Sequence, residues 1–343
     1  MKTFALRPQP EVDIRDIRVF RAENFPDSAL IPWLDRPDWR ARVAAMRDSG
    51  ELTGEQAELC TQWAENGYVI VPKMFLADQL DRAWVQYEEA IAKNLLRPAD
   101  DYSADGTLPG RTLTPHLQVP GFDSLLRDPV VVNLVSLLLG TEVLPFQTIA
   151  GHKGSQQKAH SDSIHMTTYP QGYLVANWIA FEDIAPDSGP LEYYPGSHRL
   201  PYSYTRECGI SLEEGRDGYG AYHAKYETHV QRQITEHKLR AHYFHAGKGD
   251  VLFWHANLLH GGSPIQNMAR SRRALVCHYF AEGCVCYHDY TGTPSYLTQI
   301  PQLKREQFSA EDYLRLNPDV AAAGVDPYKH YLEFGIKEKR RVR

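Results

Sequence analysis

Hydrophobic residues recur at helical spacing in the first third of the chain. The segment 53–66, TGEQAELCTQWAEN, begins with Thr53, a residue type that caps helix amino termini, and it is followed by Gly67. This pattern predicts a helix that starts after Thr53 and stops at the glycine. The β-branched run YVIVP at 68–72 then predicts a short strand.

Further helices are expected on both sides of this unit. The amphipathic segment 76–96 and the strongly apolar segment 129–139 both have helical spacing, and a shorter helix is expected within 36–50. The intervening segment 98–124 is rich in glycine, proline and polar residues, so it is predicted to be a loop.

After Gly140 the pattern changes to short apolar or alternating runs bounded by Gly, Pro, Asp and Ser. Such runs predict strands joined by turns. They lie at 142–154, 160–169, 172–183, 189–197, 250–262 and 272–282. Helices first and strands afterwards predict an α+β protein, with the strands in a β-sandwich or barrel.

A long polar insertion interrupts the strands between His198 and Gly249. It contains five histidines, at positions 223, 229, 237, 242 and 245. Their spacing matches no common metal site, so exposed side chains are expected. Insertions of this length often form lids or binding elements when they border a site.

The end of the chain predicts a small helical module. Ser309 is placed to cap a helix that ends near Asn317–Pro318, and Asp326 with Pro327 opens a second helix that ends at Gly335. The expected organisation is therefore an extension at 1–51, a main domain at 52–295 and a helical module at 305–343.

Charge and cysteine content exclude several classes of protein. The net charge of −6 and the pI of about 6.2 argue against a nucleic-acid or anionic-membrane surface. No apolar run is long enough to span a bilayer, and the first residues lack a signal-peptide core. Five cysteines without a C-x-x-C pair favour a reduced, cytoplasmic protein, with Cys284 and Cys286 as free thiols on one strand.

The stretch AHSDSIH concentrates candidate chemistry. On a strand, His160 and Asp162 would project to the same face, whereas His165 would face elsewhere. A third metal ligand would then come from a distant strand, with His260 as the candidate and His255 as its competitor. Two histidines and one carboxylate form the facial set of non-haem Fe(II) oxygenases. Taken alone, the H-x-D tripeptide is more often a pair of ordinary polar loop residues than a metal site.

The neighbouring motifs are more specific in combination. They are Trp178 in NWIAFED, then SGPLEYYPGSHRLP, then a Gly-Asp pair before the strand that leads to His260, and finally RRALVCHYF. In this order, over roughly residues 52–290, they resemble the phytanoyl-CoA dioxygenase family of Fe(II)- and 2-oxoglutarate-dependent oxygenases. The resemblance implies a double-stranded β-helix, also called a jelly-roll or cupin-like core, flanked by the amino-terminal helices.

The resemblance also implies the ligands and the reaction. His160, Asp162 and His260 match the family's iron ligands, and the expected reaction uses Fe(II), 2-oxoglutarate and O2 to hydroxylate a C–H bond of a small metabolite. Family relatives that halogenate lack the carboxylate, so Asp162 places this chain with the hydroxylating members.

The same resemblance assigns the co-substrate contacts. Arg272 matches the arginine that holds the distal carboxylate of 2-oxoglutarate, although Arg270 and Arg273 are close enough to compete. An arginine suits this task because its guanidinium can bind a carboxylate bidentately. The co-substrate pocket is also expected to involve the residues Trp178, Gln147 and Ser263.

The substrate is less well defined. Arg111 and Thr114 are expected to lie near it, because early loops border the pocket in this family, and His165 because it lies close to the proposed iron ligands. The alternatives are a polar surface loop for Arg111 and Thr114 and a buried, hydrogen-bonded histidine for His165. The segment DYLRLNPDVAAAGVDPYKHYLEFG resembles a helical segment appended to bacterial enzymes and glycosyltransferases. That likeness implies a bacterial source and a sugar- or lipid-linked substrate.

Two other functions stay open at this point. Two histidines, a carboxylate and water can also hold Zn²⁺ for non-oxidative chemistry, and an inactive binding protein can retain the fold. The arginine near His260 argues against the zinc enzyme, and the intact ligand set argues against the inactive protein. Oligomeric state is not indicated by the sequence.

Overall fold

The computed structural model describes residues 17–98, 111–295 and 308–335, together with Pro8, Ile14, Arg305 and Arg340. The described helices are α1 (Trp39–Asp48), α2 (Gly54–Asn66), α3 (Ala77–Ala92), α4 (Pro120–Leu126), α5 (Pro129–Leu139), α6 (Leu212–Arg216), α7 (Glu227–Glu236), α8 (Ala310–Leu316), α9 (Pro318–Ala323) and α10 (Pro327–His330).

Short 3₁₀ segments are η2 (Ala22–Asn24), η3 (Pro115–Leu117), η4 (Asp162–Ile164) and η5 (Ser197–Arg199), and π-helical turns are η6 (Tyr222–Tyr226) and η9 (Tyr331–Gly335). The described strands are β1 (Tyr68–Val71), β2 (Thr112–Leu113), β3 (Val143–Gly151), β4 (Thr167–Tyr169), β5 (Leu174–Ala180), β6 (Leu191–Tyr193), β7 (His242–Phe244), β8 (Val251–His255), β9 (His260–Gly262), β10 (Ala274–Ala281), β11 (Val285–His288) and β12 (Thr293–Pro294).

The helix predicted after Thr53 is confirmed as α2. The Thr53 side chain accepts from the backbone N–H of Gln56, and the Gln56 side chain accepts from the N–H of Thr53, which forms a capping box. Gly67 ends the helix with a φ of 79°, and a Cβ there would lie 2.5 Å from the Cγ of His198. Only glycine suits this position, because it combines a left-handed backbone with a close neighbour.

Three expectations need correction. The segment 98–124 is not all loop, since α4 starts at Pro120 and packs on α3; residues 99–110 lie outside the described part. The polar insertion is not a single loop, since it contains α6, η6, α7 and strand β7. The carboxy-terminal module has an additional helix, α9, because Pro318 can occupy the first turn of a new helix after Asn317.

The strands form three sheets. The largest has six antiparallel strands in the order β1-β8-β5-β10-β3-β2, and two smaller sheets have the orders β7-β6-β9 and β12-β11-β4. Most neighbours in the large sheet are distant in sequence. The antiparallel sheets with added helices agree with the predicted α+β class.

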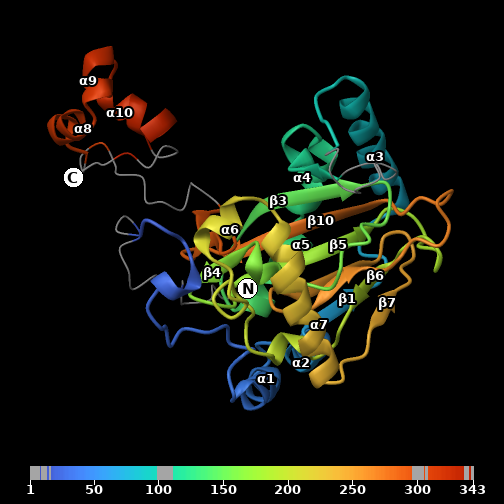
Figure 1. Ribbon diagram of the computed structural model, residues 1–343. Coiled ribbons are helices and arrows are strands. Elements are labelled where there is room, and N and C mark those ends of the chain that lie inside the picture. The colour runs from blue at the N-terminus through green and yellow to red at the C-terminus, as the bar shows by residue number, and fades with distance from the viewer. Residues whose placement is uncertain are drawn as a thin grey trace.

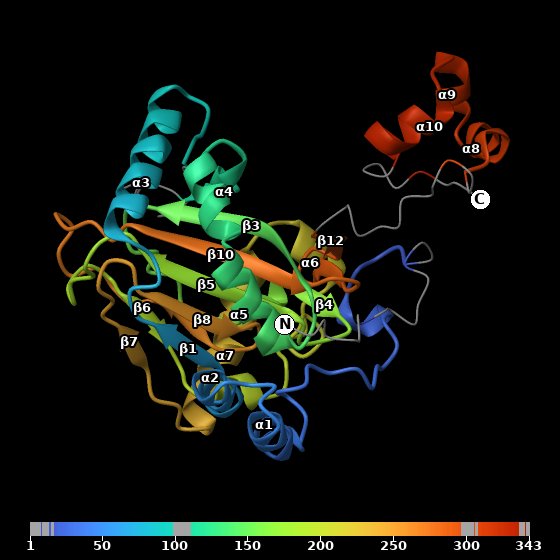
Figure 2. The same cartoon turned by 180° about the vertical axis from the view of Figure 1, so that it is seen from behind.

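The two faces of the large sheet have different neighbours. In Figure 2, α5 crosses this sheet on the viewer's side, while in Figure 1 α7 lies in front of the opposite side. Val175, Phe253 and Cys277 point to the helical side and belong to the largest hydrophobic cluster. Trp178 and Trp254 point to the other side, where they pack with residues of β6 and β7.

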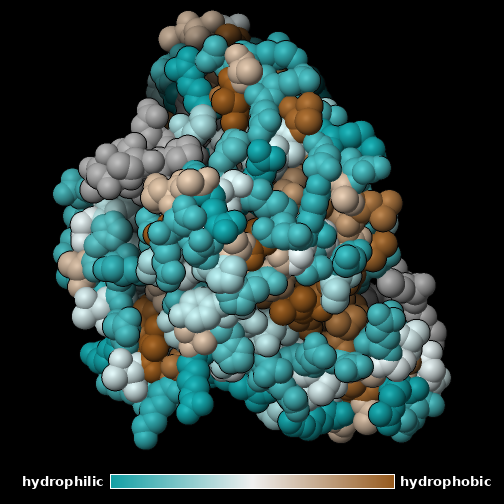
Figure 3. Space-filling model, turned by 90° about the vertical axis from the view of Figure 1, so that its right-hand side faces the viewer, coloured by the Kyte–Doolittle hydropathy of each residue, from teal (hydrophilic) through white to brown (hydrophobic). Residues whose placement is uncertain are grey.

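The helices α8 to α10 have a small core of their own, formed by Tyr313, Val320 and Tyr331. On the face shown in Figure 3, hydrophobic residues form separate patches among hydrophilic ones. Within the described residues, no helix combines the length and apolar character that crossing a membrane requires. All five cysteines are free thiols, as expected.

Candidate metal centre

Three side chains from two segments far apart in the sequence converge on one point between the sheets. His160 forms an isolated antiparallel bridge with His260, the first residue of β9, and each backbone N–H donates to the other's carbonyl at 2.9 Å. Asp162 begins η4 two residues later. One ligand atom from each of His160, Asp162 and His260, here called the triad, lies within 4.8 Å of the others, and all three residues are buried.

The route to this geometry differs from the predicted one. Residues 160–165 do not form a regular strand, because the chain turns at Ser161 into η4. His165 therefore does not face away from the triad: its ring centroid lies 6.3 Å from that of His160. The expectation from strand alternation does not apply to His165, since alternation holds only while the strand continues.

Backbone carbonyls fix the orientation of both triad imidazoles. The Nδ1 of His160 contacts the Lys158 carbonyl at 2.9 Å, and the Nδ1 of His260 contacts the Leu258 carbonyl at 3.0 Å. A carbonyl only accepts, so each Nδ1 carries the proton and each Nε2 presents its lone pair. The His260 Nε2 lies 3.6 Å from Oδ1 of Asp162, so these lone pairs point into the triad.

The protonation states also suit a metal. Burial, together with the nearby His260, lowers the pKa of His160 to about 3. Burial alone would raise the pKa of Asp162, but the surrounding histidines and a hydrogen bond from Trp254 outweigh it and hold that pKa below its usual value. Neutral imidazoles and an ionised carboxylate are the forms that bind metal ions. The residues therefore fit a divalent iron.

Two further inward-facing residues adjoin Asp162, and the sequence reading missed both. The indole Nε1 of Trp254 donates to Oδ2 of Asp162 at 2.8 Å, and the Nε2 of His278 lies 3.9 Å from the same oxygen. Trp254 on β8 and His278 on β10 both pair with Ala176 of β5, so they share one face. Strand alternation in VLFWH and ALVCHYF could have indicated this shared face.

His255, the competitor for the third ligand position, lies on the other face of β8. It follows Trp254 directly, and successive strand residues point to opposite sides. Its Nε2 contacts Oδ2 of Asp35 at 3.2 Å, and its ring packs against Trp63 and His198. His255 therefore links the amino-terminal extension to the main sheet and takes no part in the triad.

The three candidate arginines differ in their surroundings. Arg272 is buried, with its guanidinium carbon 5.4 Å from the ring centroid of Trp178 and Nη1 donating to the Gly189 carbonyl at 3.1 Å. The side chains of Arg270 and Arg273 are 53% and 41% exposed, and they pair with Asp187 and with Glu182 and Glu88, respectively. Only Arg272 faces the interior with Trp178.

The other residues expected near the co-substrate lie around this region. Gln147 on β3 pairs directly with His278, so its side chain is on the triad's face of the sheet. Trp178 is the next inward-facing position after Ala176 on β5. Ser263 follows β9, and its hydroxyl donates to the Pro190 carbonyl at 2.8 Å. It therefore lies beside the segment that contacts Arg272.

The two early-loop residues differ. Nη1 of Arg111 donates to Oε1 of Gln157 at 3.1 Å, three residues before His160, and its positive charge contributes to the lowered pKa of His160. Thr114 has a φ of 52°, and its hydroxyl donates to the Leu113 carbonyl at 2.8 Å. That contact is local to the turn before η3, whereas Arg111 contacts the segment that leads to His160.

The insertion histidines form no metal site among the described residues. They are distributed along η6, α7 and β7. The Nδ1 of His223 contacts Glu227, and the Nε2 of His229 contacts the Ser203 hydroxyl. These are contacts on the surface of the helices η6 and α7.

A buried set of two histidines and one carboxylate between antiparallel sheets defines the class of non-haem iron oxygenases. The family model of phytanoyl-CoA dioxygenase (PhyH) matches residues 63–274. This chain therefore belongs to the phytanoyl-CoA dioxygenase family, and it is an oxygenase of that family's kind.

Named relatives agree with this assignment. Human peroxisomal phytanoyl-CoA dioxygenase is 25% identical over 268 residues, which cover 72% of this chain and 73% of the human protein. Ectoine dioxygenase from Stutzerimonas stutzeri is 24% identical over 267 residues, covering 72% of this chain and 84% of that protein.

Solved structures show the same fold. EctD from S. alaskensis with 2-oxoglutarate and 5-hydroxyectoine has a TM-score of 0.52 at 20% identity, covering 67% of this chain and 76% of that one. The epimerase SnoN in complex with Fe3+, alpha ketoglutarate and nogalamycin RO has a TM-score of 0.52 at 16% identity, covering 67% and 85% of the two chains.

Proposed function

We propose that this protein is an Fe(II)- and 2-oxoglutarate-dependent dioxygenase that hydroxylates an unactivated C–H bond of a small metabolite. The observation that carries the proposal is the buried triad of His160, Asp162 and His260, in ligand-ready form, on the same side of the large sheet as Arg272 and Trp178. Iron with 2-oxoglutarate and O2 supplies an oxidation that leaves one oxygen atom on the substrate and one in succinate, with release of CO2.

The chain's part is to hold and orient the metal. The triad supplies two imidazole nitrogens and one carboxylate oxygen, and three ligands leave room for the co-substrate and dioxygen. Trp254 holds Oδ2 of Asp162, which leaves Oδ1 directed at His260. Hydrogen bonds of this kind fix the orientation of the metal ligands.

Arg272 is the residue we assign to the distal carboxylate of 2-oxoglutarate. A buried guanidinium that lies over an indole has restricted freedom of movement, and it can bind a carboxylate through two parallel hydrogen bonds. Trp178 forms the adjoining wall, and Gln147 and Ser263 are assigned to the same pocket. The surface ion pairs of Arg270 and Arg273 support the choice of Arg272 over these two residues.

The finer description of the fold follows from this assignment. We infer that the large sheet and the two smaller sheets form a double-stranded β-helix within a main domain at 52–295. The extension at 1–51 and the helical module at 305–343 flank it, although α1 shares the main hydrophobic core. The five free thiols support a reducing, cytoplasmic location. The likeness of the helical module to bacterial enzymes supports a sugar- or lipid-linked substrate.

The experiment is an anaerobic titration of the full-length protein with Fe(II) and 2-oxoglutarate. Wild type should show the weak visible charge-transfer band of the chelate, and Asp162→Ala should lose it. On admission of O2, wild type should release succinate slowly without added substrate. Absence of the band, with tight Zn²⁺ binding instead, would contradict the proposal. A zinc hydrolase is less well supported, because hydrolysis at a zinc ion does not require a buried arginine such as Arg272.

A further inference from the structure

A group of aromatic rings adjoins the triad on the side of the insertion. The His165 cluster, as we call it, comprises His165, Tyr219, Tyr222, His288 and Tyr290. The ring centroid of His165 lies 4.9 Å from Tyr222, 5.3 Å from His288, 5.9 Å from Tyr219 and 6.4 Å from Tyr290. Since the same ring is 6.3 Å from that of His160, the cluster is continuous with the proposed metal centre.

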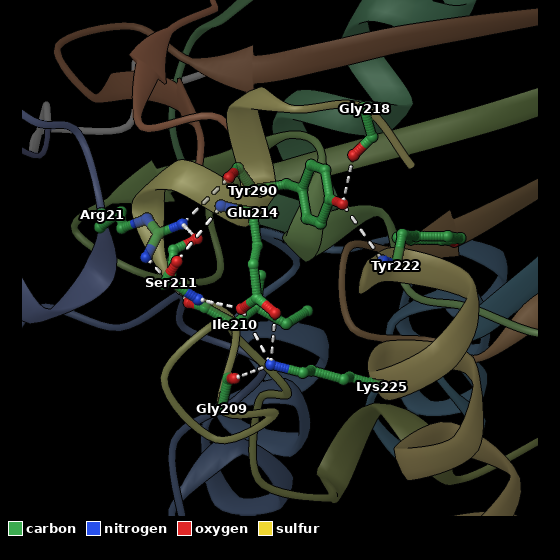
Figure 4. Close-up of polar contacts among 9 residues, drawn as sticks. All are labelled: Arg21, Gly209, Ile210, Ser211, Glu214, Gly218, Tyr222, Lys225 and Tyr290. Carbon is green, nitrogen blue, oxygen red and sulfur yellow. Dashed lines mark hydrogen bonds and ion pairs between the residues drawn. The ribbon is translucent and has the colours of Figure 1, made fainter. Parts of the chain in front are cut away.

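The cluster is held in place by the insertion and the amino-terminal extension (Figure 4). The hydroxyl of Tyr290 donates to the Gly218 carbonyl at 2.7 Å and accepts from the N–H of Tyr222 at 3.1 Å. Lys225 pairs with Glu214 at 2.7 Å, which joins η6 to α6. Arg21 donates to the Tyr290 carbonyl at 3.2 Å. The position of these rings is therefore built into the fold.

The cluster is accessible and has an unmet hydrogen-bonding requirement. Tyr219 is 52% exposed at its rim, whereas Tyr222 and Tyr290 are buried. The Nδ1 of His165 is buried and has no hydrogen-bond partner among the described residues. A buried nitrogen of this kind favours a ligand that can pair with it. Burial, His288, His160 and Arg111 hold the pKa of His165 well below its usual value, so its ring is neutral.

Arg111 adds a positive charge beside the segment that carries His160 and Asp162. The backbone carbonyl of its partner Gln157 accepts from the N–H of Gly262 at 2.8 Å, so Gln157 lies beside β9. The Gln157 side chain that Arg111 contacts also lies beside the hydroxyl of Tyr222, so Arg111 is close to the His165 cluster as well as to the triad segment.

We propose that Arg111 and the His165 cluster form the substrate site, and that the substrate carries an oxyanion next to a flat or cyclic part. This inference rests on the proposed function and specifies its substrate class. Arg111 binds the oxyanion by charge-assisted hydrogen bonds, His165 donates or accepts one more, and Tyr222 packs against the ring. The oxyanion is a carboxylate of a free acid or a phosphate of a carrier-linked compound.

The test uses matched probes with the full-length protein, Fe(II) and saturating 2-oxoglutarate under anaerobic conditions. Benzoate and phenyl phosphate carry an oxyanion on a ring, and benzamide and benzyl alcohol are their neutral counterparts. Binding is measured by calorimetry while the chelate band is monitored, so that displacement of 2-oxoglutarate is visible. We expect at least one anion to bind about tenfold tighter than its neutral counterpart, since a charge-assisted bond is lost in the latter.

Two variants test whether Arg111 and His165 cause the tighter binding of the anionic probes. Arg111→Gln should abolish the difference between the anion and its neutral counterpart, and His165→Phe should reduce it. The chelate band should be unchanged in both. Arg127→Gln, which removes a surface arginine paired with Asp123, is the matched control and should behave as wild type. Tighter benzoate binding identifies a carboxylate, and tighter phenyl phosphate binding identifies a phosphate.

Three results would overturn the inference. One is equal binding of anions and neutral probes, and another is no binding of any probe at millimolar concentration. The third is loss of 2-oxoglutarate affinity in Arg111→Gln, which would place Arg111 in the co-substrate pocket. Failure of the proposed function itself would look different, because the chelate band would then be absent from the wild type before any probe is added.

Discussion

The indole of Trp254 donates a 2.8 Å hydrogen bond to Oδ2 of Asp162 and thereby fixes the carboxylate whose Oδ1 faces His260 at 3.6 Å. The two residues are 92 positions apart in sequence. Trp254 is buried on β8, so its ring has little freedom to leave this contact. The contact predicts that the tryptophan matters for metal binding although it is not a ligand.

Trp254→Phe should weaken Fe(II) binding about 10- to 100-fold, the usual effect of removing a hydrogen bond to a metal-bound carboxylate. The affinity is measured by competition with a chelating dye. Trp84→Phe is the matched control, because Trp84 is equally buried and donates to Glu88 on the helical side of the sheet. Equal Fe(II) affinity in Trp254→Phe and wild type would show that Trp254 contributes packing alone and that its hydrogen bond to Asp162 does not affect metal binding.

Removal of the third ligand should abolish stoichiometric metal binding. His260→Ala leaves two ligands, which do not hold a divalent ion at micromolar concentration. His255→Ala removes the neighbouring histidine that contacts Asp35 on the other face, and it should retain the metal while losing some stability. Metal content after dialysis, read by atomic emission, checks both, and retained iron in His260→Ala would refute the ligand assignment.

Arg272→Gln should weaken the binding of 2-oxoglutarate about 10- to 100-fold, because the variant loses a charged, bidentate partner for the carboxylate. The change is read from the concentration of 2-oxoglutarate that half-saturates the chelate band. Arg273→Gln removes an exposed arginine one position away and should leave this concentration unchanged. The reverse pattern would mean that Arg273 is the co-substrate residue.

Buried histidines should make the metal-free protein sensitive to acid. Burial lowers the pKa of His198 to about 3 and that of His288 to about 4, from an ordinary value of 6.5. Below pH 6.5 these two histidines are therefore protonated in the unfolded chain but still neutral in the folded chain. Above pH 6.5 these histidines do not reduce the free energy of unfolding. Below pH 6.5 each of them lowers it by about 1.4 kcal/mol per pH unit.

Urea unfolding of the metal-free protein between pH 7.5 and pH 5 measures this dependence. His198→Gln should have a shallower dependence by about one proton. His237→Gln should match wild type, because His237 is exposed at the end of α7. A free energy of unfolding that is constant down to pH 5 would contradict the assigned burial of these imidazoles.

The sequence by itself determined the local elements. The capped helix α2, its stop at Gly67 and the following strand β1 were readable because capping groups, glycine conformation and hydrophobic period act over a few residues. The same holds for α3 and α5. The triad residues were found through motif order and family resemblance, which carry information that spacing alone does not.

Only the tertiary structure decided which side chains meet. The turn at Ser161 brings His165 toward the triad, which strand alternation did not indicate. Pairing of β8 and β10 with β5 places Trp254 and His278 beside Asp162, and the insertion brings Tyr222 to His165. These contacts join residues far apart in sequence, so they depend on sheet order and register, which local periodicity does not encode.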